Sequence, residues 1–357
     1  MTMHVAVSGW LCGTPSGANR RLLALLAHAG ERLRPGERIT LLHRPDFVPP
    51  PLRGVQCVAI DIPAAPTWRR AFAEHRRLPA LLQRLGATVL DHGFLPLPRV
   101  QVPVCLTVHD LRGVDGLTHR PRWLEARTLR RACERAAAVI TPSRWSAERL
   151  HQLAPAAPAP VVIGNGVEVN TPPPTHGPAP FPLPSNGFLL HIGHLEARKN
   201  LSVVVRALAR LPQATRPELW LVGRDAGARA ALARCARRGD VTLRCLGVLP
   251  DAEVAVLYQH ARAVVVPSRY EGFGLCALEA LAAGRPLLAA RATALPEVVG
   301  DDGLLLPVDD DAAWAVAIDS LPGQAAYDAA VAARARSRYA WADAAVRLLQ
   351  TWRGQEN

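Results

Sequence analysis

Lysine is almost absent from this sequence. Its 357 residues contain 42 lysines and arginines together, and Lys199 is the only lysine, so its basic character rests on arginine. Aromatic residues make up only 5% of the chain, and it has neither a lysine-rich nor an arginine–glycine tract. A net charge of +12 alone would suit a nucleic-acid-binding protein, but such proteins usually combine basic tracts with aromatic side chains. We therefore expect no nucleic-acid partner, and a gel-shift assay tests that alternative.

Signals for secretion and membrane insertion are also missing. No apolar run approaches the roughly 18 residues of a membrane-spanning helix, and the N-terminal MTMHVAVSGW lacks the basic start of a signal peptide. The seven cysteines are scattered without a C-x-x-C pair, which favours reduced thiols over disulfides or a zinc site. These absences predict a cytoplasmic protein in which any membrane contact is peripheral.

Common motifs of nucleotide-binding and hydrolytic proteins are absent as well. The sequence has no G-x-x-x-x-G-K-[ST], H-E-x-x-H or G-x-S-x-G pattern. An Asp-x-Asp pair, Asp309 and Asp311, occurs within VDDDAAW, which is typical of a helix N-terminus rather than of a metal site. We therefore expect neither a bound metal nor a resident cofactor.

Short apolar strands alternate with helical segments along the chain, and one proline-rich stretch interrupts them. This alternation predicts parallel sheets with helices on both faces. Prolines crowd residues 170–186, which indicates a linker because proline cannot join a sheet ladder. We predict an α/β protein with two doubly wound, Rossmann-like domains, residues 1–169 and 187–338. In such folds ligands bind at the carboxyl ends of the strands, and the cleft between two facing domains is the expected site.

Positive charge is concentrated in the first predicted domain. Residues 1–168 contain 22 arginines against 12 Asp and Glu, a net charge of +10, whereas residues 187–357 have a net charge of +2. The helical segments 68–85 and 120–136 mix tryptophan and leucine with many arginines. The imbalance favours an anionic partner for the first domain, and the alternative is a set of solvated, arginine-rich helices.

The segment VVVPSRYEGFGLCALEALAAGRP, residues 264–286, carries the clearest chemical signal. An apolar strand is followed by Glu271, a glycine-containing loop and an apolar helix whose first N–H groups would face a ligand. Glu279 lies in that helix, where an ionised carboxylate needs hydrogen-bond donors such as the hydroxyls of a ribose. The alternative is an ordinary strand–loop–helix junction, in which Glu271 offsets the helix dipole and Glu279 pairs with an arginine.

Two adjacent cations follow another predicted strand end. Arg198 and Lys199 lie between the strand GFLLHIG and a helix that either Asn200 or Ser202 is expected to cap. An arginine fork beside a compact ammonium group suits a diphosphate. The alternative is a pair of solvated surface cations.

The first half of the chain offers two further candidates. His109 ends the predicted strand LTVHD, and Gly17 marks the turn between the first strand and the first helix. Both positions face the ligand-binding edge of a doubly wound sheet. The alternatives are a structural histidine and an ordinary tight turn.

Taken together, these motifs resemble the retaining glycosyltransferases of family 4, which have the GT-B fold. Glu271 to Glu279 matches the E-x7-E signature of that family, and GHLEARKNL resembles its G-x-L-E-P-R-K-N-L motif. The run AAGRPLLAARATALPEVVGDDGLLLPVDD is similar to the one that follows the signature in the family. The resemblance implies an acceptor-binding domain at 1–169 and a nucleotide-sugar-binding domain at 187–338. It also implies that residues 339–357 form a helix that packs back on the first domain.

The resemblance implies a role for each candidate residue. Arg198 and Lys199 would hold the donor diphosphate and stabilise the departing nucleotide, while Glu271 and His109 would contact the donor sugar. Glu279 would bind the ribose hydroxyls. The other implied donor-binding residues are Gly17, Gly223, Val248, Gly272, Phe273, Gly274 and Leu275.

The implied reaction is a retaining, metal-independent transfer of a hexose, with mannose or a related sugar favoured, in bacterial polysaccharide or glycoconjugate synthesis. The donor would be a nucleotide-diphosphate sugar, and the acceptor a saccharide or a lipid-linked saccharide. Together with the charge of the first domain, this predicts peripheral contact with the anionic inner face of the plasma membrane. The alternatives are a nucleotide-sugar epimerase, a phosphorylase of the same fold, or a degenerate scaffold, and intact motifs argue against the last.

Overall fold

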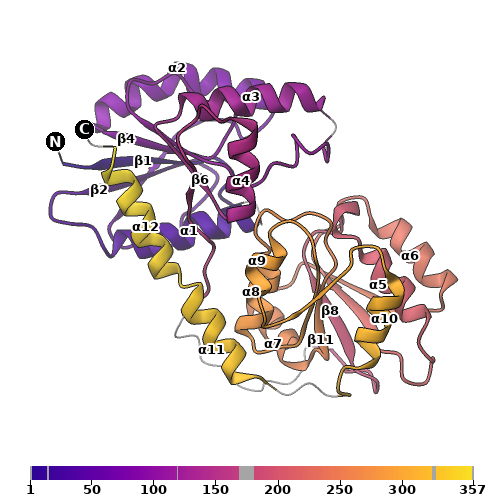
Figure 1. The fold of residues 1–357 in the computed structure, drawn as a ribbon. Helices are drawn as coiled ribbons and strands as arrows, with labels where there is room; N and C mark the ends of the chain where they lie inside the picture. The colour runs from indigo at the N-terminus through magenta and orange to yellow at the C-terminus, as the bar shows by residue number, and fades with distance from the viewer. Residues whose placement is uncertain (1, 14–15, 119, 169–180, 324–326, 356–357) are drawn as a thin grey trace. The chain divides into compact units, whose positions relative to one another are not determined.

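The computed structural model describes residues 2–13, 16–118, 120–168, 181–323 and 327–355, and it divides into two compact units (Figure 1). The first unit comprises Met1–Gly166 together with Tyr339–Asn357, and the second comprises Val167–Arg338. Of the linker predicted at 170–186, residues 170–180 lie outside the described part of the chain. The chain therefore returns to its first unit after completing the second.

The first unit is built on a seven-stranded sheet in the order β3-β2-β1-β4-β5-β6-β7, with every pair of neighbours parallel. The strand order reverses between β1 and β4, which makes this pair the switch point of the sheet. The strands are β1 (His4–Gly9), β2 (Arg38–His43), β3 (Val55–Ala59), β4 (Val89–His92), β5 (Val104–Thr107), β6 (Ala138–Thr141) and β7 (Val161–Val162).

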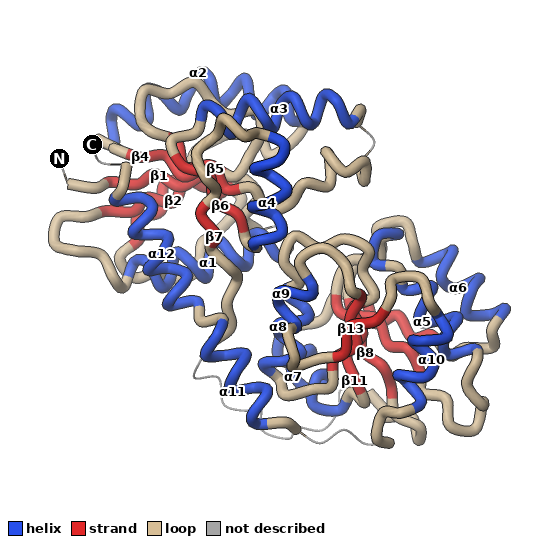
Figure 2. Tube along the Cα trace, viewed as in Figure 1, coloured by secondary structure: helices blue, strands red, loops and turns tan. Residues whose placement is uncertain are grey.

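Helices cover both faces of this sheet (Figure 2). They are α1 (Gly17–Gly30), α2 (Thr67–Leu85), α3 (Arg122–Arg135), α4 (Arg144–Leu153) and α12 (Trp341–Arg353). The last helix packs beside α1, because Trp341, Ala345, Leu348 and Trp352 form an apolar stripe that joins the core of this unit. The Trp352 indole Nε1 also donates to Asp91 Oδ2 at 2.7 Å, where burial raises the pKa of the Asp91 carboxyl to about 6. The C-terminal helix is thus an integral part of the first unit.

The second unit repeats the arrangement with a six-stranded parallel sheet in the order β10-β9-β8-β11-β12-β13, so its switch point lies between β8 and β11. The strands are β8 (Phe188–Ile192), β9 (Glu218–Val222), β10 (Leu243–Gly247), β11 (Ala263–Val266), β12 (Leu287–Ala290) and β13 (Leu304–Leu306). The helices are the short 3₁₀ helix η1 (Ala197–Lys199), α5 (Leu201–Ala209), α6 (Arg229–Arg238), α7 (Asp251–His260), α8 (Leu275–Ala282), α9 (Leu295–Val299), α10 (Asp311–Asp319) and α11 (Ala329–Arg338).

The two sheets confirm the predicted pair of doubly wound, Rossmann-like domains. Central strands of parallel sheets are buried on both faces, which is why β11 reads as an unbroken apolar run. Helix α3, which falls in the helical segment predicted at 120–136, ends at Arg135, because Ala136 is already extended ahead of β6.

Candidate active site

Three loops meet at the carboxyl edge of the second sheet. The loop after β8 leads into η1, which holds Arg198 and Lys199, and the loop after β11 holds Glu271. Thr293 lies in the loop after β12. Because β8, β11 and β12 are neighbours in the sheet, Lys199 and Glu271 meet although they are 72 positions apart in the chain. Their meeting point is the switch point, where doubly wound sheets bind ligands.

Lys199 and Glu271 form a tight and nearly buried ion pair. Lys199 Nζ donates to Glu271 Oε1 at 2.6 Å, and Arg198 Nη1 lies 3.4 Å from Glu271 Oε2. Only 7% of the Lys199 side chain and 12% of the Glu271 side chain are exposed to solvent. Burial opposes ionisation of the carboxyl, but the charges of Lys199 and Arg198 outweigh it and lower the pKa of Glu271 to about 2. Glu271 is therefore ionised at neutral pH, with its charge balanced inside the protein.

Arg198 is held in place by two further acceptors. Its Nε donates to Glu196 Oε2 at 2.7 Å, and its Nη1 donates to the Tyr270 carbonyl oxygen at 2.9 Å. These contacts fix the planar guanidinium group beside Lys199. The structure thus brings together three of the residues selected from the sequence, Arg198, Lys199 and Glu271.

Asn200 stands at the N-cap position of α5, but its side chain does not cap the helix. Its backbone is left-handed, with φ at 52°. The side-chain amide donates to the Val308 carbonyl at 2.8 Å and accepts from Arg269 Nη2 at 3.2 Å. The expected side-chain cap from Asn200 or Ser202 is therefore wrong. Asn200 instead fastens the turn that carries Lys199 to two neighbouring loops.

Thr293 contacts the backbone of Glu271 from the adjacent loop. Its hydroxyl accepts from the Glu271 N–H at 2.9 Å and donates to the Glu271 carbonyl at 3.0 Å. No local pattern in the sequence marks this residue, because the contact joins two loops 22 positions apart.

The glycine-containing loop after Glu271 leads directly into α8. Gly274 has a φ of 101°, and a Cβ at this position would lie 2.7 Å from Leu295 Cδ2, so the turn requires glycine. Phe273 is only 5% exposed, and its ring belongs to the core. Gly272, Phe273 and Leu275 can therefore offer backbone groups to a ligand at this edge.

Glu279 lies in α8 and is half-buried. The hydroxyl of Tyr258, on α7, donates to Glu279 Oε2 at 3.1 Å. A neutral donor thus holds one oxygen of this carboxylate in an otherwise apolar helix.

The remaining candidates of the second unit, Gly223 and Val248, follow strands β9 and β10. Gly223 directly follows β9 with a φ of 140°, and a Cβ there would lie 2.1 Å from the Gly193 carbonyl oxygen, so the close approach of the chain after β8 and the chain after β9 requires glycine. Val248 follows β10, and the residue is 64% exposed. Both residues lie on the same edge of the sheet as Lys199, one and two strands away from β8.

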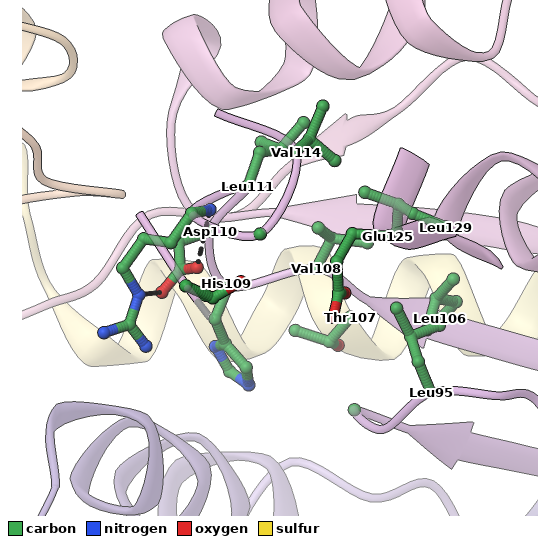
Figure 3. A pocket seen from close by; sticks show the side chains of 14 residues that line it. Leu95, Leu106, Thr107, Val108, His109, Asp110, Leu111, Val114, Glu125 and Leu129 are labelled. Carbon is green, nitrogen blue, oxygen red and sulfur yellow. Dashed lines mark hydrogen bonds and ion pairs between the residues drawn. The ribbon is translucent and has the colours of Figure 1, made fainter. Parts of the chain in front are cut away.

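His109 lines a cavity of about 250 Å³ in the first unit (Figure 3). Its neighbours include Asp110, Arg112 and Glu125, and the Arg112 Nε donates to Asp110 Oδ2 at 2.8 Å. Burial, together with the charge of Arg21, lowers the pKa of His109 to about 4. The imidazole is therefore neutral at pH 7 and able to donate and accept hydrogen bonds.

Gly17 is the first residue of α1. Ser16 caps this helix by accepting from the Asn19 N–H at 3.2 Å. The preceding residues 14–15 lie outside the described chain. Gly17 and His109 thus belong to the first unit, whereas all other candidates belong to the second.

His191 was not selected from the sequence, yet it lies beneath the ion pair. It is fully buried in β8, and its Nδ1 is 2.9 Å from the Val265 carbonyl oxygen. Since a carbonyl only accepts, Nδ1 carries the proton and Nε2 is an acceptor, which has no partner among the described residues. Burial and the nearby Lys199 lower the pKa of His191 to about 4. The sequence signal was a polar residue inside the apolar run FLLHIG.

Within the described residues, no group of three or more His, Cys, Asp or Glu side chains is arranged to hold a metal ion. The acidic run at 309–311 instead begins α10, where Asp310 accepts from the N–H groups of Ala312 and Ala313 at 3.1 and 3.0 Å. No helix in the described part of the chain has the length and apolarity needed to cross a membrane.

Both units match known protein families. Residues 15–171 match Glycosyltransferase Family 4, and residues 187–323 match glycosyl transferases group 1. O-antigen chain mannosyltransferase B of Escherichia coli is 41% identical over 146 residues, which are 40% of this chain and 38% of that protein. D-inositol 3-phosphate glycosyltransferase of Jonesia denitrificans is 30% identical over 290 residues, which are 73% of this chain and 68% of that protein. The chain thus spans less than half the length of the first relative and about two thirds of the second.

Solved structures resemble the chain over its whole length. Sucrose-phosphate synthase from Thermosynechococcus elongatus has a TM-score of 0.77 at 19% identity, and the alignment covers 99% of this chain and 98% of that one. HepE from Anabaena, in complex with UDP-glucose, has a TM-score of 0.74 at 18% identity, covering 99% of this chain and 100% of that one. At this level of identity the likeness concerns the fold alone, and it confirms the predicted one.

Proposed function

Because this chain belongs to glycosyltransferase family 4 and has the GT-B fold, we propose that it moves a hexose from a nucleotide-diphosphate sugar to a saccharide or lipid-linked acceptor, with retention of the anomeric configuration. The observation that carries the proposal is the cluster of Lys199, Arg198 and Glu271 at the switch point of the second sheet. Nucleotides bind at such points in doubly wound sheets, and two cations there suit a diphosphate.

Lys199 and Arg198 would divide the binding of the diphosphate between them. Arg198 is already fixed by Glu196 and by the Tyr270 carbonyl, whereas Lys199 has a flexible stem and one main partner, Glu271. A contact between unit charges at 4 Å amounts to about 4 kcal/mol at an effective dielectric constant near 20, before desolvation. A doubly charged diphosphate therefore competes well with one carboxylate for Lys199. As the sugar–phosphate bond breaks, charge grows on the leaving phosphate, and both cations stabilise it.

Glu271 and Glu279 would bind the two sugar rings of the donor. Once Lys199 turns to the diphosphate, the Glu271 carboxylate can accept hydrogen bonds from donor-sugar hydroxyls. The amides between Gly272 and Leu275, at the start of α8, would contact the diphosphate and sugar. Glu279, with one oxygen held by Tyr258, would accept from the ribose hydroxyls.

The other residues selected from the sequence would also bind the donor. Gly223 and Val248 would lie near the base. Gly17 would allow the first loop to approach the diphosphate. His109, neutral because its pKa is lowered to about 4, would hydrogen-bond the donor sugar near the reacting carbon. No protein nucleophile takes part, since the acceptor hydroxyl attacks from the face that the nucleotide leaves.

Binding experiments should identify the nucleotide of the donor, and with it narrow the choice of sugar. The Escherichia coli relative is a mannosyltransferase, which supports mannose, while HepE binds UDP-glucose, which supports a uridine nucleotide. A thermal-shift screen against UDP, GDP, ADP and dTDP, with and without EDTA, separates these choices, and we expect GDP to give the largest shift. Transfer activity that disappears in EDTA would contradict a metal-independent reaction.

A Glu271→Gln variant tests the proposed site. It should reduce transfer by orders of magnitude, measured as glycosylated product by mass spectrometry, while circular dichroism shows a native fold at the assay temperature and the melting temperature falls because Lys199 loses its carboxylate partner. Asp319→Asn removes an exposed carboxylate at the end of α10 and should leave transfer unchanged. Donor turnover without any acceptor would indicate an epimerase, and formation of a sugar 1-phosphate from inorganic phosphate would indicate a phosphorylase.

We further propose that the first unit binds peripherally to the anionic inner face of the plasma membrane. Trp68 and Phe72 on α2 and Trp123 on α3 are 67%, 60% and 67% exposed. Arg69 and Arg76 stack over the rings of Trp68 and Phe72, respectively. Exposed aromatic rings beside arginines suit the interface of an anionic bilayer. In a flotation assay, the wild type should bind phosphatidylglycerol vesicles more strongly than phosphatidylcholine vesicles. A Trp68→Ser/Trp123→Ser variant should lose this preference for the anionic vesicles. Equal binding of the wild type to both kinds of vesicle would overturn the proposal.

A further inference from the structure

Two successive peptide groups at Glu271 are held by hydrogen bonds from outside their loop. The Tyr270 carbonyl and the Glu271 N–H belong to one peptide group: Arg198 donates to its oxygen at 2.9 Å, and the Thr293 hydroxyl accepts from its N–H at 2.9 Å. The next peptide group is held as well, because Thr293 donates to the Glu271 carbonyl at 3.0 Å. Since the backbone has only two soft dihedrals per residue, fixing both planes fixes the direction in which the Glu271 side chain leaves the chain.

Thr293 makes these contacts from an unfavourable backbone conformation. Its φ is 48°, in the left-handed region that β-branched residues seldom adopt. Glycine would relieve this strain, so the turn itself does not call for threonine, whereas the hydrogen bonds to Glu271 require a hydroxyl. Among the described residues only Asn200, Asp240 and Thr293 combine a side chain with a positive φ, and two of these three adjoin the Lys199–Glu271 pair. Such strain at one site is typical of positions that serve a function rather than the fold.

We propose that Thr293 is a positioning residue for the transfer reaction, which aims the Glu271 carboxylate at the donor sugar without touching the donor itself. The inference rests on the proposed function, because it assigns Glu271 to the donor sugar. In the absence of donor, Lys199 holds the carboxylate at 2.6 Å. When Lys199 turns to the diphosphate, that contact is lost, and the hydrogen bonds from Thr293 and Arg198 are what keep Glu271 in its productive direction. A small misalignment of a reacting group is enough to lower a rate by orders of magnitude.

A matched pair of substitutions at Thr293 tests the role of the hydroxyl. Thr293→Ser keeps the hydroxyl and removes the methyl, whereas Thr293→Val keeps the shape and removes the hydroxyl. With the nucleotide sugar whose nucleotide gives the largest thermal shift, Thr293→Val should lower kcat on the order of 10- to 100-fold, and Thr293→Ser should stay within about three-fold of wild type. The affinity for the free nucleoside diphosphate should change less than about three-fold in both, since ribose and phosphate contacts remain. Equal kcat values for the two variants, or a loss of affinity as large as the loss in kcat, would overturn the inference.

A second measurement asks whether Thr293 acts through Glu271. In a Glu271→Gln background, Thr293→Val should lower the residual rate by no more than about two-fold, because the residue it positions has already lost its charge. An equal loss in both backgrounds would mean that Thr293 acts independently, and the inference would be wrong. Should Thr293→Val fail to fold, Thr293→Gly serves the same comparison, since it removes the hydroxyl and the strain together.

These results separate the inference from the function on which it rests. If Glu271→Gln keeps wild-type transfer, the proposed site fails as a whole. If Glu271→Gln is inactive and Thr293→Val is fully active, only the positioning role fails. Thr215→Val is the control, because the Thr215 hydroxyl also contacts a carbonyl, that of Pro212 at 3.4 Å, but on an exposed turn; it should leave kcat unchanged.

Discussion

Replacing Lys199 by methionine should destabilise the second unit in a way that depends on pH. Methionine keeps an unbranched apolar stem of similar length, so the substitution removes the ammonium group and little else. Among the described residues, Glu271 is then left with Arg198, at 3.4 Å, as a cationic contact, in a position that is only 12% exposed. A buried carboxylate that loses one partner is strongly destabilising, because its desolvation is no longer compensated.

The magnitude follows from the pKa of Glu271. That pKa is about 2 in the folded protein, against an ordinary value of 4.5, and the difference corresponds to about 3 kcal/mol of stability at neutral pH. The folded-state pKa is the lower of the two, so the unfolded chain binds the proton first as the solution is acidified. The stabilisation is therefore fully present above pH 4.5 and is lost as the pH falls from 4.5 toward 2.

Urea denaturation followed by circular dichroism at pH 7.0, 5.5, 4.5 and 3.5 measures this effect. At pH 7.0 the wild type should be more stable than Lys199→Met by about 3 kcal/mol, and the gap should narrow at the two lowest pH values. Arg210→Met is the control, because the Arg210–Asp311 pair is similarly short, at 2.6 Å, but more than half of the arginine is exposed. Its removal should change stability little and without the same pH dependence.

Two results would refute this reasoning. A gap that stays constant down to pH 3.5 would mean that Lys199 contributes packing rather than charge. A wild type and a Lys199→Met variant of equal stability at pH 7.0 would mean that desolvation cancels the attraction completely, and that the pKa of Glu271 is not depressed by its neighbours.

Three further predictions concern single contacts. Lys199→Arg should lower transfer at least about 10-fold with little change in melting temperature, because a planar guanidinium can still pair with Glu271 but cannot supply the compact point charge that suits the leaving phosphate; full activity would show that any cation suffices. Gly223→Ala should reduce stability in urea by on the order of 3 kcal/mol, because the new Cβ would meet the Gly193 carbonyl at 2.1 Å and φ is 140°; a near-neutral effect would contradict the close approach of these strand ends. Trp352→Phe should lower the free energy of unfolding in urea by about 1–3 kcal/mol, since Asp91 loses the indole N–H that donates to it at 2.7 Å. An unchanged urea midpoint would show that this hydrogen bond contributes nothing to stability.

The doubly wound fold could be predicted because its signals are local. Apolar runs such as that of β11 mark strands buried on both faces, and helical stripes such as that of α12 mark the faces that pack on them. Because each follows a predicted strand, Arg198, Lys199 and Glu271 could also be placed on one edge of the sheet, since parallel strands end together. The order of predicted strands along the chain did not show that Lys199 and Glu271 contact each other directly.

Contacts between distant loops could not be predicted from spacing. Thr293 meets the backbone of Glu271 only because the loops after β11 and β12 run side by side, and nothing within its own loop requires a hydroxyl. Asn200 was expected to cap a helix on the strength of its residue type, but tertiary contacts with Arg269 and Val308 use its side chain instead. His191 was hidden in an apolar run, where a polar residue acquires meaning only once its neighbours across the sheet are known.

The solitary lysine makes one amine of this protein a spectroscopic reporter. Protein produced in a medium with ¹³C-labelled lysine carries a single labelled side chain, so its ε-methylene gives one NMR signal that needs no assignment. That carbon lies 3.5 Å from the position that a Cβ on Gly193 would occupy, and the attached Nζ is bonded to Glu271. Movement of Lys199 from carboxylate to phosphate would shift this one resonance. Each candidate nucleotide could then be titrated into the labelled protein, and the signal of Lys199 would report on binding at the proposed site.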